Sequence, residues 1–284
     1  MILFLDTANI DEIKQAVDWG ILDGVTTNPT HVAKAGKPHH QVLEEICGLV
    51  NGPISAETTS THMDGILDEA RELASIHPNI VVKVPLMKEG LKAVKRLAEE
   101  GIRCNVTVTF QPLQALLAAK VGAYFVSPFI DRLNRIGEDG FQVVEKIRKI
   151  FDNYRFATKL LVASVRSPLT VMQAALVGAD ICTMPFDVLA MLYNHPLTDQ
   201  GIDIFLKDAA RIPPERVDAV RATPAPEPAK IAAAMDTVKT PVIPELTKSQ
   251  PPVTITPSKT PPALVVRRSG GGSGLSQAGS AESK

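Results

Sequence analysis

Short apolar runs alternate with segments of helical periodicity through most of the 284-residue chain. In the helical segments the apolar residues recur on one helix face, as Leu91, Val94 and Leu97 do. The short apolar runs are bounded by glycine or polar residues and therefore predict strands. These strands are predicted at 2–6, 24–28, 53–57, 80–84, 102–108, 124–127, 159–164 and 180–183.

Successive predicted strands begin roughly 20 to 35 residues apart, which leaves room for a helix between each pair. Eight such units predict an α/β fold, a (β/α)8 TIM barrel with a parallel sheet. A doubly wound open sheet is the alternative, but the chain lacks the GxGxxG phosphate loop typical of that fold. A further C-terminal helix is predicted at 199–211, where apolar side chains would pack on the barrel's own helical ring or on a neighbouring subunit.

The composition changes sharply after Arg221. Residues 222–284 hold ten of the 22 prolines and none of the aromatic residues, so they cannot bury enough apolar surface to offset the entropy of ordering them. We therefore predict a barrel domain at 1–212 and a disordered tail at 213–284, Pro/Ala/Thr-rich and then Gly/Ser-rich, with a marginal helix at 229–238. The tail is either a solvated segment without specific function or a docking or localisation peptide.

The 30 basic and 31 acidic side chains nearly cancel, so neither nucleic acid nor a membrane surface is expected as a partner. The chain has no membrane-spanning apolar stretch and no signal-peptide core, and we expect a cytoplasmic protein. Three cysteines without CxxC spacing predict neither a metal site nor a disulfide scaffold. His31, His62, His77 and His195 stand next to no serine or cysteine in a triad-like pattern, and no role is assigned to them.

Polar residues gather where the predicted strands end. In barrels of this kind the active site lies at the carboxyl ends of the strands and on the loops that follow them. Asp6 or Ser127 alone would be interpreted as a turn or cap residue, but seven of the eight strands deliver a polar group to the same face. These groups, with the two arginines just beyond them, are Asp6, Asn28, Glu57, Lys83, Asn105, Thr107, Ser127, Arg132, Ser164 and Arg166.

Lys83 is the most informative of these residues. It interrupts the run IVVKVP, which otherwise has the pattern of a fully buried parallel strand. Lysine is almost never buried without a partner or a purpose. One interpretation is that Lys83 reaches the barrel mouth or pairs with a carboxylate. The other is a desolvated, neutral amine that attacks a carbonyl to form a Schiff base, which then serves as the electron sink for C–C chemistry.

Two further groups of residues suit that chemistry. Asp6 could exchange a proton with a substrate hydroxyl, and Glu57 could move protons while the carbinolamine forms and dehydrates. Arg132 and Arg166, with Ser164, form a candidate phosphate clamp, since guanidinium groups bind oxyanions in a bidentate manner. The alternative for the arginines is that they are solvated surface residues.

These residues lie in motifs that resemble the small transaldolase family, which includes the fructose-6-phosphate aldolase-like enzymes. The resemblance covers about residues 1–212. Its motifs are FLDTANIDEIK at 4–14, GILDGVTTNPT at 20–30, NIVVKVPL at 79–86, QALLAAKVGAYFVSPFIDRL at 114–133, ASVRSP at 163–168, GADICTMP at 178–185 and HPLTDQGIDIF at 195–205.

The resemblance implies a (β/α)8 barrel of class I aldolase type with no metal and no organic cofactor. It implies that Lys83 is the Schiff-base lysine, that Asp6 is the acid and base of C–C cleavage, and that Glu57 works through a water that Thr107 helps to hold. It assigns the hydroxyls of the dihydroxyacetone unit to Asn28, Asn105 and Ser127, and the substrate phosphate to Arg132, Ser164 and Arg166. It also places Phe129 among the substrate-binding residues. Family members form pentameric rings, often doubled to decamers, so a homo-oligomer is implied.

The implied reaction transfers a dihydroxyacetone unit between sugar phosphates in the pentose phosphate pathway. Aldolase-type members of the family resemble one another in carrying glutamine where this chain has Glu57, and tyrosine where it has Phe129. Both residues are of the transaldolase type here. The alternatives are a fructose-6-phosphate aldolase-type enzyme, or a barrel scaffold whose tail carries a recruitment peptide.

Overall fold

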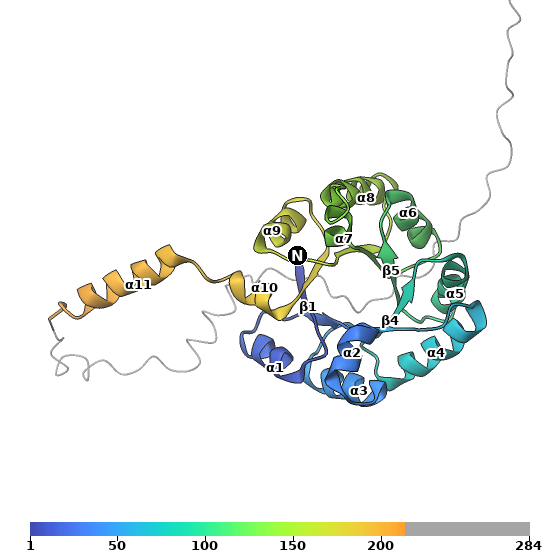
Figure 1. Ribbon diagram of the computed structural model, residues 1–284, viewed down its shortest axis with the longest axis horizontal. Helices are drawn as coiled ribbons and strands as arrows, with labels where there is room; N and C mark the ends of the chain where they lie inside the picture. The colour runs from blue at the N-terminus through green and yellow to red at the C-terminus, as the bar shows by residue number, and fades with distance from the viewer. Residues whose placement is uncertain (214–284) are drawn as a thin grey trace, which may run out of the picture. The chain divides into compact units, whose positions relative to one another are not determined.

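The computed structural model describes residues 1–213, in which eight parallel strands close into a barrel in sequence order, with the last strand paired to the first (Figure 1). This arrangement confirms the predicted (β/α)8 fold. The strands are β1 (Ile2–Asp6), β2 (Gly24–Thr26), β3 (Ile54–Glu57), β4 (Ile80–Pro85), β5 (Cys104–Thr109), β6 (Phe125–Pro128), β7 (Lys159–Val162) and β8 (Ile181–Met184).

Helices follow the strands in the order of the chain; all but α11 surround the barrel, and α11 extends away from it (Figure 1). They are α1 (Ile10–Asp18), α2 (Pro29–Ala35), α3 (His39–Leu49), α4 (Met63–Ile76), α5 (Lys88–Glu99), α6 (Pro112–Lys120), α7 (Ile130–Asn134), α8 (Gly140–Tyr154), α9 (Pro168–Leu176), α10 (Phe186–Met191) and α11 (Pro196–Ala209). Two connections between strands therefore hold more than the single helix per unit that the periodicity predicts: α2 with α3, and α7 with α8. No helix of residues 1–213 has both the length and the apolar character needed to cross a membrane.

Alternate residues of each strand face the barrel interior or the helical ring, as the period of a strand requires. In β4, Val82 and Val84 belong to the large core between the strands and the helices, whereas Val81 belongs to a second cluster inside the barrel. The buried members of that inner cluster are Phe4, Val81, Phe125, Leu161, Ala163 and Ile181. They fill the lower part of the barrel, so that side chains closer to the carboxyl ends of the strands rest on an apolar floor.

Gly24 shows how tightly this floor is packed. A Cβ atom on Gly24 would overlap the ring of Phe4, which is itself only 1% exposed. Phe4 in turn meets Phe125 edge to face, with ring centroids 6.1 Å apart, an arrangement that aromatic pairs favour. The absence of a side chain at Gly24 therefore makes room for the aromatic pair that closes the floor.

Two strands were predicted to run two residues too far at their carboxyl ends, and four others end one residue beyond the predicted end. The strand predicted at 24–28 stops at Thr26, because Asn28 is the N-cap of α2 and its side chain accepts a hydrogen bond from the His31 amide at 3.0 Å. The strand predicted at 159–164 stops at Val162, and Ser164 has a φ of 61°, which takes the chain out of the extended conformation. Both residues thereby stand above the sheet rather than within it.

The predicted C-terminal helix is present as α11 and begins at Pro196, three residues before the predicted start. None of its side chains is buried within residues 1–213, and Phe205 is 74% exposed. Packing of this helix on its own barrel, one of the two expected arrangements, is therefore not what the structure shows. The tail at 214–284, including the marginal helix predicted at 229–238, lies outside the described residues.

Candidate active site

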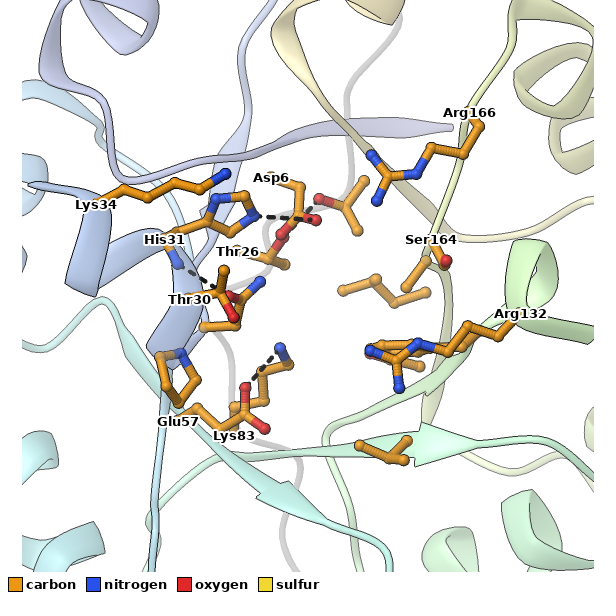
Figure 2. Close-up of a pocket in the computed structure, with 18 residues that line it drawn as sticks. Asp6, Thr26, Thr30, His31, Lys34, Glu57, Lys83, Arg132, Ser164 and Arg166 are labelled. Carbon is orange, nitrogen blue, oxygen red and sulfur yellow. Dashed lines mark hydrogen bonds and ion pairs between the residues drawn. The ribbon is translucent and has the colours of Figure 1, made fainter. Parts of the chain in front are cut away.

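A cavity of about 480 Å³ opens at the carboxyl ends of the strands, directly above the apolar floor (Figure 2). Nine of the residues predicted for the site line it, and they come from loops and strands far apart in the sequence. These nine are Asp6, Asn28, Glu57, Lys83, Ser127, Phe129, Arg132, Ser164 and Arg166. The folded chain thus brings eight of the ten predicted polar groups, and Phe129, to one cavity.

Lys83 lies at the base of the cavity and is only 4% exposed. The parallel register of β3 and β4 places it directly beside Glu57, and its Nζ donates hydrogen bonds to Glu57 Oε2 at 2.9 Å and to the carbonyl oxygen of Thr27 at 3.2 Å. The lysine is therefore buried and paired with a carboxylate, as the first interpretation of the sequence expects, and its role as a nucleophile stays a prediction. Glu57 is also the acceptor to which an ammonium proton can pass before the amine attacks a carbonyl.

Asp6 faces the same cavity from the end of β1. Thr26 donates a hydrogen bond of 2.8 Å to Asp6 Oδ1, and the hydroxyl of Thr183 lies 2.7 Å from that of Thr26. Burial raises the pKa of Asp6, but the His31 ring, the charge of Lys83 and the Thr26 hydroxyl lower it, and the net shift is downward. Asp6 is thus held as a carboxylate, the form that accepts a proton.

Asn105 and Thr107 are fully buried in β5 and do not line the cavity, unlike the other predicted site residues. Asn105 accepts a hydrogen bond from the Ser127 hydroxyl at 2.6 Å and donates one to the Ser55 hydroxyl at 3.1 Å. It therefore fixes Ser127, which does reach the cavity. The buried hydroxyl of Thr107 has no hydrogen-bond partner among the described residues, so it remains able to bind a small polar molecule.

The backbone of β5 is irregular beside the cavity. The register of β5 with β6 shifts between Val106 and Thr109, and Val108 has a φ of 59°. Positive φ is rare for a β-branched residue and costs about 1–3 kcal/mol. The irregularity turns the Val108 side chain into the cavity wall.

Arg132, Ser164 and Arg166 lie together on the side of the cavity opposite His31 and Glu57 (Figure 2). The Arg132 guanidinium stacks over the Phe129 ring, 5.1 Å from its centroid. Within residues 1–213, neither guanidinium forms an ion pair with a carboxylate. Two cations without an acidic partner, together with a hydroxyl, make this side of the cavity suitable for an anionic group such as a phosphate.

Nine residues that line the cavity were not predicted from the sequence, and five of them are polar: Thr26, Thr30, His31, Lys34 and Thr183. Thr26 and Thr183 are inward-facing residues of strands, and the two-residue period of a strand would have found them. His31 and Lys34 lie one turn apart on α2, immediately after Asn28. Their approach to Asp6 depends on the direction of that helix, for which the sequence carries no clear signal.

The thiols and the metal-ligating side chains suggest no second chemistry in the described part of the chain. Burial raises the pKa of Cys104 and of Cys182 to about 12, and that of Cys47 to about 11, so none is a ready thiolate. Across residues 1–213, no group of three or more His, Cys, Asp and Glu side chains is placed to hold a metal ion.

The site can now be compared with known proteins. Residues 3–223 match the family described as Transaldolase/Fructose-6-phosphate aldolase. The chain is 57% identical over 213 residues to a "Probable transaldolase" of Hydrogenobaculum sp. (strain Y04AAS1), a match that covers 75% of this chain and 98% of the relative. It is 55% identical over 213 residues to proteins of the same description from Dictyoglomus turgidum and Aquifex aeolicus, covering 75% of this chain and 100% and 98% of those relatives. The chain therefore belongs to the transaldolase/fructose-6-phosphate aldolase family.

Proposed function

We propose that the protein is a transaldolase that moves a dihydroxyacetone unit between sugar phosphates through a Schiff base on Lys83. The observation that carries this proposal is a buried amine, hydrogen-bonded to Glu57 at 2.9 Å, at the base of a cavity that Asp6 also lines. The reaction is sedoheptulose 7-phosphate plus glyceraldehyde 3-phosphate to erythrose 4-phosphate plus fructose 6-phosphate. Its place is the pentose phosphate pathway in the cytoplasm.

The first half of the reaction loads the donor ketose. Lys83 passes a proton to Glu57 and attacks the C2 carbonyl of the ketose, which gives a carbinolamine. Glu57 returns the proton to the departing hydroxyl, and loss of water leaves a protonated imine on Lys83. The unpaired hydroxyl of Thr107 supports a water in this exchange, because such a water could bind it without displacing another partner.

Cleavage then uses Asp6. Its carboxylate takes the proton of the C4 hydroxyl, the C3–C4 bond breaks, and the bonding electrons move to the imine nitrogen to give an enamine. The first aldose phosphate leaves, and a second aldose phosphate takes its place. The enamine attacks its carbonyl carbon while Asp6 returns the proton to its carbonyl oxygen, and hydrolysis of the new imine frees Lys83.

Substrate binding divides between two sides of the cavity. Arg132, Ser164 and Arg166 would hold the phosphate, since the two guanidinium groups have no acidic partner in the described part of the chain. Asn28 and Ser127 would bind hydroxyls of the three-carbon unit near Lys83, with Asn105 fixing Ser127 from behind. Each substrate would then lie with its reacting carbons above the apolar floor.

Phe129 favours transfer over free aldol cleavage. Its ring lies 5.9 Å from Lys83 Nζ and carries no acidic hydrogen, so it cannot protonate the enamine. An enamine that is not protonated waits for an acceptor aldehyde, which is the behaviour of a transferase. The fructose-6-phosphate aldolase alternative would require another proton source at this position.

The exposed helix α11 supports the further proposal of a homo-oligomer. Leu197, Phe205 and Leu206 on this helix are each at least 65% exposed. Apolar side chains of that size are usually covered by a partner, and a second copy of the chain is the partner that we propose.

The function is tested by giving the full chain fructose 6-phosphate with and without erythrose 4-phosphate. A transaldolase forms sedoheptulose 7-phosphate when the acceptor is present and releases very little free dihydroxyacetone when it is not. Rapid release of dihydroxyacetone without acceptor would identify an aldolase. No turnover of any sugar phosphate pair would support the scaffold alternative.

A further inference from the structure

His31 makes a contact with Asp6 that the proposed mechanism has not used. It is the third residue of α2, and its ring folds back so that Nε2 lies 3.6 Å from Asp6 Oδ2 (Figure 2). The other oxygen, Asp6 Oδ1, already accepts the hydrogen bond from Thr26. The two oxygens therefore have different neighbours, and Oδ2 is the one that His31 approaches.

The ring of His31 stands between two cavities. It lines the cavity above Lys83 and also a neighbouring cavity of about 690 Å³, and Asp6, Lys34 and Arg166 line both as well. The His31 side chain is 25% exposed, so water can reach it. The Asp6 side chain is 23% exposed, so water can reach both partners of the contact.

Several charged groups surround this contact. Lys83 and Glu57 face it across the first cavity, and the charged groups of the second cavity are Asp11, Glu12, Lys34, Lys37, Glu45, Arg166 and Asp187. Lys37 is already paired with Glu45 at 2.7 Å, and Glu12 accepts a hydrogen bond from Thr7 at 2.6 Å. Asp6 is the carboxylate that His31 contacts among the described residues.

We propose that His31 is a positioning residue, whose ring contact with Asp6 Oδ2 holds that oxygen toward the substrate. The inference rests on the proposed function, because it assigns to Asp6 the proton of the C4 hydroxyl. When that proton moves to Asp6, the contact to the ring weakens, and it forms again when the second aldose takes the proton back. The proton balance of the transfer is unchanged.

His31→Leu tests the proposal, with His31→Gln as the conservative variant and His40→Leu as the matched control. His40 lies at the surface on α3 and contacts Glu72 rather than any residue of the cavity. His31 contributes to the lowering of the Asp6 pKa, so its removal raises that pKa. The acidic limb of the kcat/KM profile of His31→Leu should therefore move to higher pH.

The same variant should lose about tenfold in kcat, because Asp6 loses a contact that orients it, while KM for the donor ketose changes about twofold at most. His31→Gln keeps an N–H donor and should recover most of the lost kcat, and His40→Leu should behave as the unaltered protein. A kcat and an acidic limb unchanged in His31→Leu would overturn the proposal. Equal losses in His31→Leu and His31→Gln with no shift of the limb would also overturn it, since they indicate a merely structural role.

A second variant and a second measurement make the test decisive. If His31→Leu does not fold, His31→Asn replaces it, because its amide is too short to reach Oδ2. Borohydride trapping with fructose 6-phosphate separates this inference from the proposed function, since Schiff-base formation depends on Lys83 and Glu57. An adduct on Lys83 in the unaltered protein, with a pH profile that His31→Leu does not change, would defeat the role of His31 alone. No adduct in the unaltered protein would defeat the proposed function and this inference together.

Discussion

The interior of the barrel holds two layers of side chains that differ completely in chemistry although the same strands supply them. In β1, Phe4 belongs to the apolar floor, and Asp6, two residues later, faces the cavity. In β4, Val81 and Lys83 make the same pair of contributions. The period of a strand thus lets each segment supply one residue to stability and the next inward residue to the site.

The two layers also differ in their contribution to the free energy of folding. The floor is made of well-packed apolar and aromatic side chains, whose burial is favourable. The upper layer contains a buried ion pair, a β-branched residue at positive φ and the unpaired buried hydroxyl of Thr107, each of which is unfavourable on its own. The floor therefore stabilises a site that would not fold on its own contacts.

We expect the largest effect on catalysis from Lys83→Arg, a substitution in the upper layer. The guanidinium keeps a positive charge beside Glu57 but cannot give the neutral nucleophile, so kcat should fall by about 10⁴-fold or more. Lys34→Arg is the matched control, because Lys34 lines the same cavity without contacting Glu57. Transfer assays on both variants check this, and a Lys83→Arg enzyme with more than a few per cent of normal kcat would contradict it.

Phe125→Ala should instead destabilise the lower layer, the apolar floor. Removing a fully buried aromatic side chain leaves a cavity and should reduce the free energy of unfolding by about 3–5 kcal/mol. The exposed aromatic Tyr154 provides the control, since Tyr154→Ala should cost far less. Urea unfolding measures both variants. A loss below about 1 kcal/mol for Phe125→Ala would show that the floor does not carry the stability assigned to it.

Phe129→Tyr should change the outcome of the reaction rather than its rate. It adds a hydroxyl near Lys83 that can protonate the enamine, so release of free dihydroxyacetone without acceptor should rise several-fold relative to transfer. Phe110→Tyr adds the same group next to Phe129 but outside the residues that line the cavity. The ratio of the two products should shift in Phe129→Tyr alone, and an equal shift in both variants would refute the explanation.

We expect the smallest effect, a small gain in stability, from Met87→Thr, which lies outside both layers. Met87 is the N-cap of α5 and makes no capping hydrogen bond. Threonine can bond an amide in the first turn, so the free energy of unfolding should rise by about 0.5–1 kcal/mol. Met87→Ala is the control, because it removes the methionine side chain without adding a cap. Thermal unfolding that ranks Met87→Thr below Met87→Ala would contradict the prediction.

The sequence predicted the barrel and half of the residues that line the cavity for a common physical reason. A strand buried on both faces has few polar residues, so Lys83 within IVVKVP and Asp6 after ILFL stand out against their neighbours. Because all carboxyl ends of a parallel barrel lie on one face, residues that stood out in separate strands could be expected to meet. Nine predicted residues do line one cavity, and this required no knowledge of the exact register.

What the sequence did not predict depends on contacts between elements. The pairing of Lys83 with Glu57 follows from the register of β3 with β4, which no local pattern encodes. The positive φ of Val108 contradicts the preference of valine, so only the surrounding structure can impose it. His31 reaches Asp6 because Asn28 caps α2 and sets the direction in which that helix leaves the barrel.

Trapping of the covalent intermediate tests the central claim most directly. The full chain is incubated with fructose 6-phosphate, reduced with borohydride and digested, and the modified lysine is located by mass spectrometry. The account predicts one adduct, on Lys83, which is absent from Lys83→Arg and present in Lys34→Arg. An adduct on another lysine, or turnover without any adduct, would contradict the account.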